Sequence, residues 1–188
     1  MNLCKLVSRR TLQSAQPCTL LRRAIQSSST LNMPLKVGDS IPNVDLFEDT
    51  PAKKVNLAEL AQGKKMIVFA VPGAFTPGCS KTHLPGYVAK ATELKSKGVD
   101  EIVCISVNDP FVMSAWGKDM KAEGKIRMLA DTAAQFTKAM ELDQTIGPLG
   151  GIRSKRYSMV IENGKITSLQ VEPDGTGLSC SLAEAIVL

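Results

Sequence analysis

Short apolar runs separated by mixed segments dominate the pattern of this chain and predict alternating strands and helices. Met66 to Val71 is apolar throughout, Glu101 to Val107 is nearly so, and Ile126 to Ala130 is a shorter run. Runs of this length, bounded by turn residues, are typical of buried strands. The segments between and after them predict helices. The first begins at Pro77, and a second helical piece runs from Pro85 to about Lys97. The others cover residues 111–123, Asp131-Thr132 to about Met140, and 178–188.

The C-terminal third carries the clearest hairpin signal. Arg156 to Ile161 and Ile166 to Val171 flank Glu162-Asn163-Gly164-Lys165, and Asn-Gly is the favoured pair for a tight hairpin turn. Alternating residues near Val44–Phe47 predict a small hairpin at the entry of the domain. The glycine-rich stretch 147–151 is expected to be a loop. It lacks a lysine at phosphate-loop spacing and no helix follows it, so we do not expect it to bind phosphate.

These elements predict an α/β fold whose central mixed sheet is flanked by helices. Parallel strands come first and an antiparallel hairpin comes last, in the order β-α-β-α-β-α-β-β-α. This order resembles the thioredoxin fold with extensions.

A reactive thiol is predicted where the first buried strand ends. Pro72 and Gly73 break the strand, Thr76 stands where a helix N-cap is expected, and Pro77 occupies the first helical position. Cys79 then falls in the first helical turn, beside unpaired N–H groups and the positive end of the helix dipole. That environment favours the thiolate over the thiol.

The pattern Pro72-x-x-x-Thr76-x-x-Cys79 resembles the active-site motif of the peroxiredoxins, which are thiol peroxidases of the thioredoxin fold. Residues 34–182 as a whole resemble the atypical two-cysteine (type-5) class. The other stretches that carry the resemblance are Ser106–Asp109, Lys155–Val160 and Val171–Leu182.

The resemblance implies a two-cysteine cycle. Cys79 would be the peroxidatic cysteine and Cys180 the resolving one, which attacks the sulfenic acid and forms a Cys79–Cys180 disulfide within one chain. Thioredoxin would reduce this disulfide. Cys180 follows a glycine-containing loop, so we expect this loop to have fewer constraints to break than the Cys79 helix.

The remaining site residues are assigned by what peroxide reduction requires and by resemblance. Thr76 would hydrogen-bond the peroxide, and the resemblance makes Arg156 the guanidinium that stabilises the developing negative charge. Pro72 and Gly78 complete the substrate-binding motif, with N–H groups near Gly78 directed into the site. On position alone, Arg156 would be a solvated strand end.

Two alternatives concern the other sulfur and imidazole groups. Cys104 lies inside an apolar run and is interpreted as core packing. His83, the only histidine, could join Cys79, Cys104 and Cys180 in a zinc site, but their separations are poor for the closely spaced ligand pairs of such sites. We therefore expect no metal and no other cofactor, with His83 packing against the Cys79 helix.

The N-terminal composition predicts a targeting segment. Residues 1–35 contain five Lys and Arg and no Asp or Glu, which is typical of a mitochondrial transit peptide; we place its end at residue 32 and the peroxidase domain at 33–188. The alternative is a disordered basic tail. Of 23 Lys and Arg, the 18 that remain balance the 18 Asp and Glu, so the basic excess does not indicate nucleic-acid binding. No apolar run is long enough to span a membrane.

The sequence thus predicts a mitochondrial thiol peroxidase acting on hydrogen peroxide and alkyl hydroperoxides in antioxidant defence and peroxide signalling. We expect a monomer or a weak non-covalent homodimer. A start at Met33 would give a cytoplasmic form, whereas the C-terminal Ile-Val-Leu is unlike the Ser-Lys-Leu peroxisomal signal. The competing hypotheses are a redox-relay protein that passes its disulfide to a partner, and a structural thioredoxin-fold adaptor.

Overall fold

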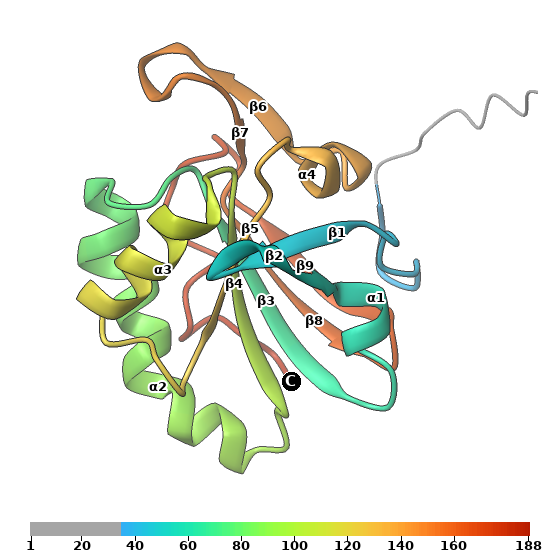
Figure 1. Ribbon diagram of the computed structural model, residues 1–188. Helices are drawn as coiled ribbons and strands as arrows, with labels where there is room; N and C mark the ends of the chain where they lie inside the picture. Colours follow the sequence, from blue (N-terminus) through green and yellow to red (C-terminus); the bar gives the residue numbers. More distant parts are fainter. Residues whose placement is uncertain (1–34) are drawn as a thin grey trace, which may run out of the picture. The chain divides into compact units, whose positions relative to one another are not determined.

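A seven-stranded mixed sheet organises the computed structural model, which describes residues 35–188 (Figure 1). The predicted segment 1–32 lies outside the described residues. The strands follow the order β2-β1-β5-β4-β3-β8-β9 across the sheet. Their bounds are β1 (Asp45–Glu48), β2 (Thr50–Asn56), β3 (Lys65–Val71), β4 (Glu101–Ser106), β5 (Arg127–Ala130), β8 (Tyr157–Glu162) and β9 (Lys165–Val171).

The pairing of these strands confirms the predicted thioredoxin-like arrangement. Strands β3, β4 and β5 are parallel, and β8 and β9 add an antiparallel hairpin beside β3. Asn163 and Gly164 turn this hairpin with φ angles of 54° and 77°, as the Asn-Gly signal predicts. The entry hairpin is also present, as β1 paired with β2.

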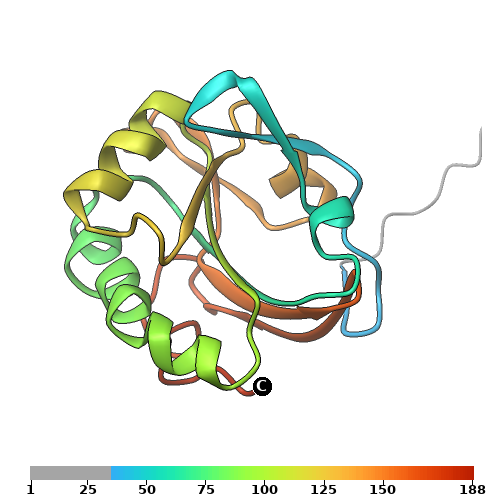
Figure 2. The same cartoon turned by 60° about the horizontal axis from the view of Figure 1, so that its bottom comes forward.

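Helices cover both faces of the sheet (Figures 1 and 2). The helical elements are α1 (Leu57–Leu60), a π-helical turn (Cys79–His83), α2 (Leu84–Ser96), α3 (Pro110–Asp119), α4 (Gln135–Ala139) and a 3-10 turn (Gly147–Leu149). The helix predicted from Asp131-Thr132 begins only at Gln135, with Ala134 as its N-cap residue, but the Asp131 carboxylate accepts from the N–H groups of Phe136 and Thr137 in its first turn. No helix in the described part of the chain is both long and apolar enough to cross a membrane.

The core has two halves because β3 is buried on both sides. Ile67, Phe69 and Val71 pack with side chains of α2 and α3, including Tyr87 and Trp116. The alternate residues of β3 pack on the opposite face, against side chains of α1 and α4. Successive side chains of a strand point to opposite faces, so an uninterrupted apolar run serves both halves.

Two segments differ from the sequence prediction. Residues 178–188 form turns and bends rather than the expected helix. The physical reason is that the N–H groups of Ser179, Cys180 and Ser181 bind the Glu172 carboxylate, where a helix would need them to bind carbonyls. In addition, the stretch around 147–151 is the tip of a second, unpredicted hairpin formed by β6 (Asp143–Ile146) and β7 (Gly151–Ser154).

The packing of α3 on β5 generates a stability prediction. A Cβ added at Gly117 would lie 2.7 Å from Cγ of Met128, so a backbone or core side chain must move. We expect Gly117→Ala to lower the free energy of unfolding by about 1–3 kcal/mol in urea denaturation. Gly86→Ala in α2 is the matched control, because a Cβ there meets nothing within 4 Å and alanine favours the helix. An equal effect of both substitutions would contradict this account of the α3–β5 contact.

Candidate active site

The sheet brings three segments that are distant in sequence to one edge. Strand β3 ends at Val71, just before the cysteine loop. Parallel pairing places Ser106, the last residue of β4, beside Val71, and antiparallel pairing places Tyr157 beside Ala70. Arg156, the residue before Tyr157, therefore lies next to the end of β3. This juxtaposition follows from strand register.

Polar contacts hold the loop between β3 and the cysteine turn. The Ala74 N–H donates to Oδ1 of Asn108 at 3.1 Å. The Ser106 hydroxyl lies 2.8 Å from the same Oδ1 and 3.2 Å from the Val71 carbonyl oxygen. Because these donors fix the loop to the end of β4, the position of the following helix is set by the sheet.

Thr76 occupies the predicted N-cap position, directly before the first helical residue Pro77, but its side chain makes no capping hydrogen bond. Its hydroxyl donates to the Gly73 carbonyl at 3.0 Å, while its own carbonyl accepts from the Ser80 N–H at 2.9 Å. This first intrahelical bond leaves the N–H groups of Gly78 and Cys79 without a carbonyl partner inside the helix. It also leaves the Thr76 oxygen free to accept a hydrogen bond, since its proton is used on Gly73.

The cysteine turn is wider than an α-helix. The Leu84 N–H donates to the carbonyl of Cys79, five residues back, which defines the π-helical turn Cys79–His83. Pro85 follows at once and cannot donate to Lys81. A proline in a helix also crowds the carbonyl four residues back, so a widened turn here accommodates it.

Cys79 and Arg156 are in direct contact. The Cys79 side chain is fully buried, and Nη1 of Arg156 donates to its Sγ at 3.3 Å. Arg156 is itself 3% exposed, and among residues 35–188 no carboxylate lies within 4 Å of its guanidinium. A buried cation without an acidic partner is costly. The Arg156 guanidinium therefore presents its positive charge directly to the Cys79 sulfur.

The backbone around Arg156 fixes the guanidinium from two sides. Its N–H donates to the Gly175 carbonyl at 2.7 Å, and its Nε donates to the Thr176 carbonyl at 3.1 Å. A Cβ at Gly78 would lie only 3.2 Å from Nη2 of Arg156, so glycine permits the close approach of the guanidinium to the helix. Pro72 is buried at the start of the loop. The structure thus places Pro72, Thr76, Gly78, Cys79 and Arg156 in one region.

His83 extends this contact by one more group. Its Nδ1 lies 3.2 Å from Nη1 of Arg156, and its Nε2 lies 2.9 Å from the Ser181 carbonyl oxygen. Arginine can only donate, so Nδ1 accepts and Nε2 carries the proton of a neutral imidazole. Burial lowers the pKa of His83 to about 4, and the charge of Arg156 acts in the same direction. His83 therefore remains neutral near pH 7.

Cys180 is not brought into contact with Cys79. Both thiols are free, and Sγ of Cys180 lies 3.5 Å from the Val171 carbonyl oxygen. The loop before Cys180 is held by several polar contacts, because Gly175 and Thr176 bind Arg156 and the Cys180 N–H binds Glu172. Several polar contacts must therefore break before this loop can move.

The structure also shows the surroundings of Cys104 and His83. Cys104 is fully buried within the apolar core of β4, where burial raises the pKa of its thiol. Within residues 35–188, no three His, Cys, Asp or Glu side chains are grouped so that they could hold a metal ion. His83 contacts Arg156 and Ser181 in this structure, and its ring packs edge-on against Phe69 and Tyr87.

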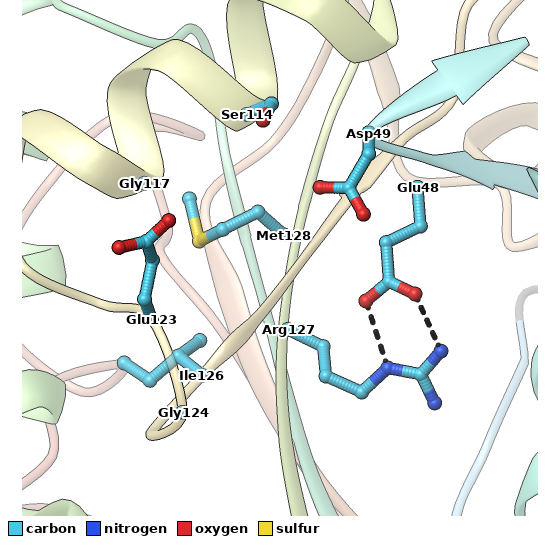
Figure 3. A pocket seen from close by; sticks show the side chains of 9 residues that line it. All are labelled: Glu48, Asp49, Ser114, Gly117, Glu123, Gly124, Ile126, Arg127 and Met128. Atoms are coloured by element: carbon cyan, nitrogen blue, oxygen red, sulfur yellow. Dashed lines mark hydrogen bonds and ion pairs between the residues drawn. The ribbon is translucent and has the colours of Figure 1, made fainter.

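A separate hollow lies between the β1–β2 turn, the end of α3 and β5 (Figure 3). A bidentate ion pair spans part of it, with Nε and Nη2 of Arg127 at 2.9 and 2.8 Å from the Glu48 carboxylate oxygens. Its lining includes neither a cysteine nor any predicted site residue. We therefore do not assign this hollow to the cysteine chemistry.

Sequence reasoning missed two residues that organise the site. Asn108 fixes the cysteine loop, and Glu172 binds the backbone around Cys180. His83 was expected beside the Cys79 helix, but its bridge from Arg156 to the C-terminal segment was not predicted. Asn108 directly follows a predicted buried strand. Sites commonly form where parallel strands end, so this position could have indicated a site residue. The Glu172 contacts had no comparable signal, because they depend on how an irregular segment folds back.

Comparisons with known proteins agree on one family. The sequence profile of the family described as Redoxin matches residues 36–186. Peroxiredoxin-2D of Arabidopsis thaliana is 44% identical over 158 residues, covering 82% of this chain and 97% of that protein. Reduced Prx3 of Vibrio vulnificus in complex with H2O2 is 48% identical with a TM-score of 0.76, over 80% of this chain and 96% of the other. Peroxiredoxin 5 of Alvinella pompejana is 47% identical with a TM-score of 0.71, over 78% and 96%.

The neutral, buried state of His83 predicts a pH dependence of stability. In the unfolded chain its pKa is about 6.5, but in the folded chain it is about 4. Below pH 6.5 the unfolded state therefore binds one more proton, and stability falls as pH decreases. Near pH 5 the free energy of unfolding should fall by about 1.4 kcal/mol per pH unit.

Urea denaturation at pH 5.0 to 7.0 measures this slope. The sequence contains no other histidine, so His83→Gln should remove most of the dependence in this interval. Parallel slopes for the wild type and the variant would show that His83 does not titrate as described.

Proposed function

The chain belongs to the peroxiredoxins and is a thiol peroxidase, and on this premise we propose that it reduces hydrogen peroxide and alkyl hydroperoxides through Cys79 and Cys180. The observation that carries the proposal is the 3.3 Å contact between the Arg156 guanidinium and the buried Cys79 sulfur. The relative crystallised with H2O2, at 48% identity, supports the choice of substrate.

In the first step, the Cys79 thiolate attacks one oxygen of the peroxide. An S–O bond forms, the O–O bond breaks, and the departing oxygen takes a proton. Cys79–SH and ROOH therefore give Cys79–SOH and ROH, with the sulfur oxidised and the peroxide reduced. The Thr76 oxygen is free to accept a hydrogen bond from the peroxide O–H, because its proton is donated to Gly73.

Fixed donors stabilise the charge that moves from sulfur to oxygen in this step. Arg156 stays protonated and offers planar paired donors. The N–H groups of Gly78 and Cys79 point from the start of the helix, where the dipole favours negative charge. These groups are already in place before peroxide binds, so little reorganisation is required during the reaction.

In the second step, the Cys180 thiol attacks the sulfenic sulfur. Cys79–SOH and Cys180–SH give the Cys79–Cys180 disulfide and one water molecule. A dithiol protein, thioredoxin, then reduces the disulfide by thiol–disulfide exchange and returns both thiols. We assign the resulting cycle to antioxidant defence and peroxide signalling, without metal or other cofactor, in a monomer or weak homodimer.

A redox-relay role is the second candidate, favoured by the position of Cys180. Cys180 is partly exposed and is not in contact with Cys79. A partner thiol could therefore compete with it for the sulfenic acid. Rapid turnover with peroxide and a thioredoxin system alone would favour the peroxidase, since a relay needs its client protein.

Peroxide consumption by cysteine variants tests the assignment of Cys79. With a thioredoxin system and hydrogen peroxide, Cys79→Ser should lose turnover because no nucleophile remains at the helix start. Cys104→Ser is the matched control and should keep nearly all activity, since the pKa of Cys104 is raised by burial. The assignment would be wrong if Cys104→Ser were inactive and Cys79→Ser active.

Mass spectrometry of the same proteins tests the second step. One equivalent of peroxide on dilute wild-type protein should give a monomer two hydrogens lighter, with a linked Cys79–Cys180 peptide pair. A covalent dimer at low concentration would instead indicate exchange between subunits.

We also propose that residues 1–32 direct the protein to mitochondria and that residues 33–188 form the peroxidase domain. The basic, acid-free composition of the segment supports this proposal. A fluorescent fusion of the full chain should enter mitochondria, and a fusion starting at Met33 should remain cytosolic. Import of the shorter fusion would refute the role of the segment.

A further inference from the structure

The Glu172 carboxylate binds three consecutive residues around the candidate resolving cysteine. Its Oε1 accepts from the backbone N–H groups of Ser179, Cys180 and Ser181 at 2.8, 3.0 and 2.9 Å. The hydroxyls of Ser181 and Ser179 add bonds of 2.7 Å to Oε1 and 2.6 Å to Oε2. Glu172 lies directly after β9, so the carboxylate is anchored to the sheet. We call residues 179–181 the resolving segment.

The Glu172 carboxylate is buried and charged at once. The residue is 2% exposed, and the donors of the resolving segment surround it. Burial opposes ionisation, but the hydrogen bonds from Ser179 and Ser181 outweigh it and lower the pKa of Glu172 to about 2. Hydrogen bonds to an ionised group are roughly twice as strong as neutral ones. These bonds therefore hold the segment more firmly than a turn of neutral contacts would.

The opposite side of the resolving segment is held by α2 and the turn before it. The Ser181 carbonyl accepts from Tyr87 Oη at 2.8 Å and from His83 Nε2 at 2.9 Å. Ser181 is fully buried between these groups and Glu172. The Ser181 N–H is thus bonded to Glu172 and its carbonyl to Tyr87 and His83. These bonds fix the backbone directly after Cys180.

In this arrangement Cys79 and Cys180 are both free thiols. Its Sγ lies against the Val171 carbonyl, whereas Cys79 Sγ lies against Arg156. A disulfide requires the two Cα atoms to come within about 7 Å and the sulfurs to bond at about 2 Å. If Cys180 moves toward Cys79, its N–H must leave Glu172.

We propose that Glu172 is a positioning residue that retains the resolving segment in the reduced protein and limits the rate at which Cys79–SOH and Cys180–SH condense to a disulfide and water. This inference rests on the proposed function, because it takes Cys180 as the resolving cysteine. Glu172 contacts no reacting atom, so its effect falls on condensation and leaves the attack on peroxide unchanged.

Stopped-flow fluorescence of the full chain can separate the two steps. Trp116, the only tryptophan, donates from Nε1 to Ser80 Oγ beside Cys79 and reports on this turn. The rate of sulfenic acid formation increases with peroxide concentration, whereas the rate of condensation does not. Each protein is mixed with a series of hydrogen peroxide concentrations, and the disulfide is quantified by mass spectrometry after acid quench.

Glu172→Gln keeps the size and one acceptor oxygen but removes the charge. We expect condensation to become about ten-fold faster, equivalent to about 1.4 kcal/mol of barrier, with the peroxide-dependent rate within two-fold of wild type. Asp174→Asn is the matched control and should condense at the wild-type rate, because within residues 35–188 the Asp174 side chain accepts from the N–H groups of Thr176 and Gly177 and from no residue of the resolving segment. Ser181→Ala removes one hydroxyl donor to Glu172, so the condensation rate should increase by less than in Glu172→Gln. This variant tests the inference if Glu172→Gln does not fold.

The outcomes separate this inference from the function on which it rests. If the wild type forms no Cys79–Cys180 disulfide, the assignment of Cys180 fails. If the wild type forms it, but neither Glu172→Gln nor Ser181→Ala condenses faster, the inference is overturned. Acceleration by Asp174→Asn to the same extent would also overturn it, because the effect would then belong to the loop as a whole.

Discussion

The contact between the Arg156 guanidinium and the Cys79 sulfur is the interaction on which the site depends. Both side chains are buried, and among the described residues no carboxylate neutralises the guanidinium. The guanidinium is a permanent cation, and its hydrogen bond to the sulfur fixes a positive charge beside Cys79. Neutral His83 adds a hydrogen bond to the guanidinium without adding a competing charge. The Cys79 sulfur therefore faces a fixed positive charge that no described carboxylate cancels.

The sheet makes this contact possible at little conformational cost. Antiparallel pairing of β3 with β8 sets Arg156 beside the end of the strand that leads to Cys79. Parallel pairing of β3 with β4 brings Asn108 to the same edge, where it fixes the loop. Positions that are held by strand register cannot drift independently, so the donors are preorganised before a substrate arrives.

The reactive cysteine and the C-terminal segment are linked through one histidine. His83 accepts from Arg156 at one nitrogen and donates to Ser181 at the other. The Ser181 N–H in turn reaches Glu172. Two side chains, Arg156 and His83, thus connect the Cys79 sulfur to the backbone next to Cys180. The two cysteines proposed to form a disulfide are thus connected by a chain of hydrogen bonds, although both thiols are free in this structure.

The sequence by itself determined the features that depend on neighbouring residues. Local patterns predict the buried apolar strands, the Asn163-Gly164 turn and the order strand, turn, Cys79, and the structure contains all three. The motif around Cys79 also indicated the family. Such features are visible in sequence because period, turn chemistry and capping act over a few residues.

Only the tertiary structure decided which distant groups meet. It showed that Thr76 donates to Gly73, that His83 bridges Arg156 and Ser181, and that residues 178–188 are not helical. The last difference has a single cause: a buried carboxylate from another segment satisfies the N–H groups that a helix would have used. Local propensity cannot anticipate such a partner, because strand register and chain reversal bring it within hydrogen-bonding distance.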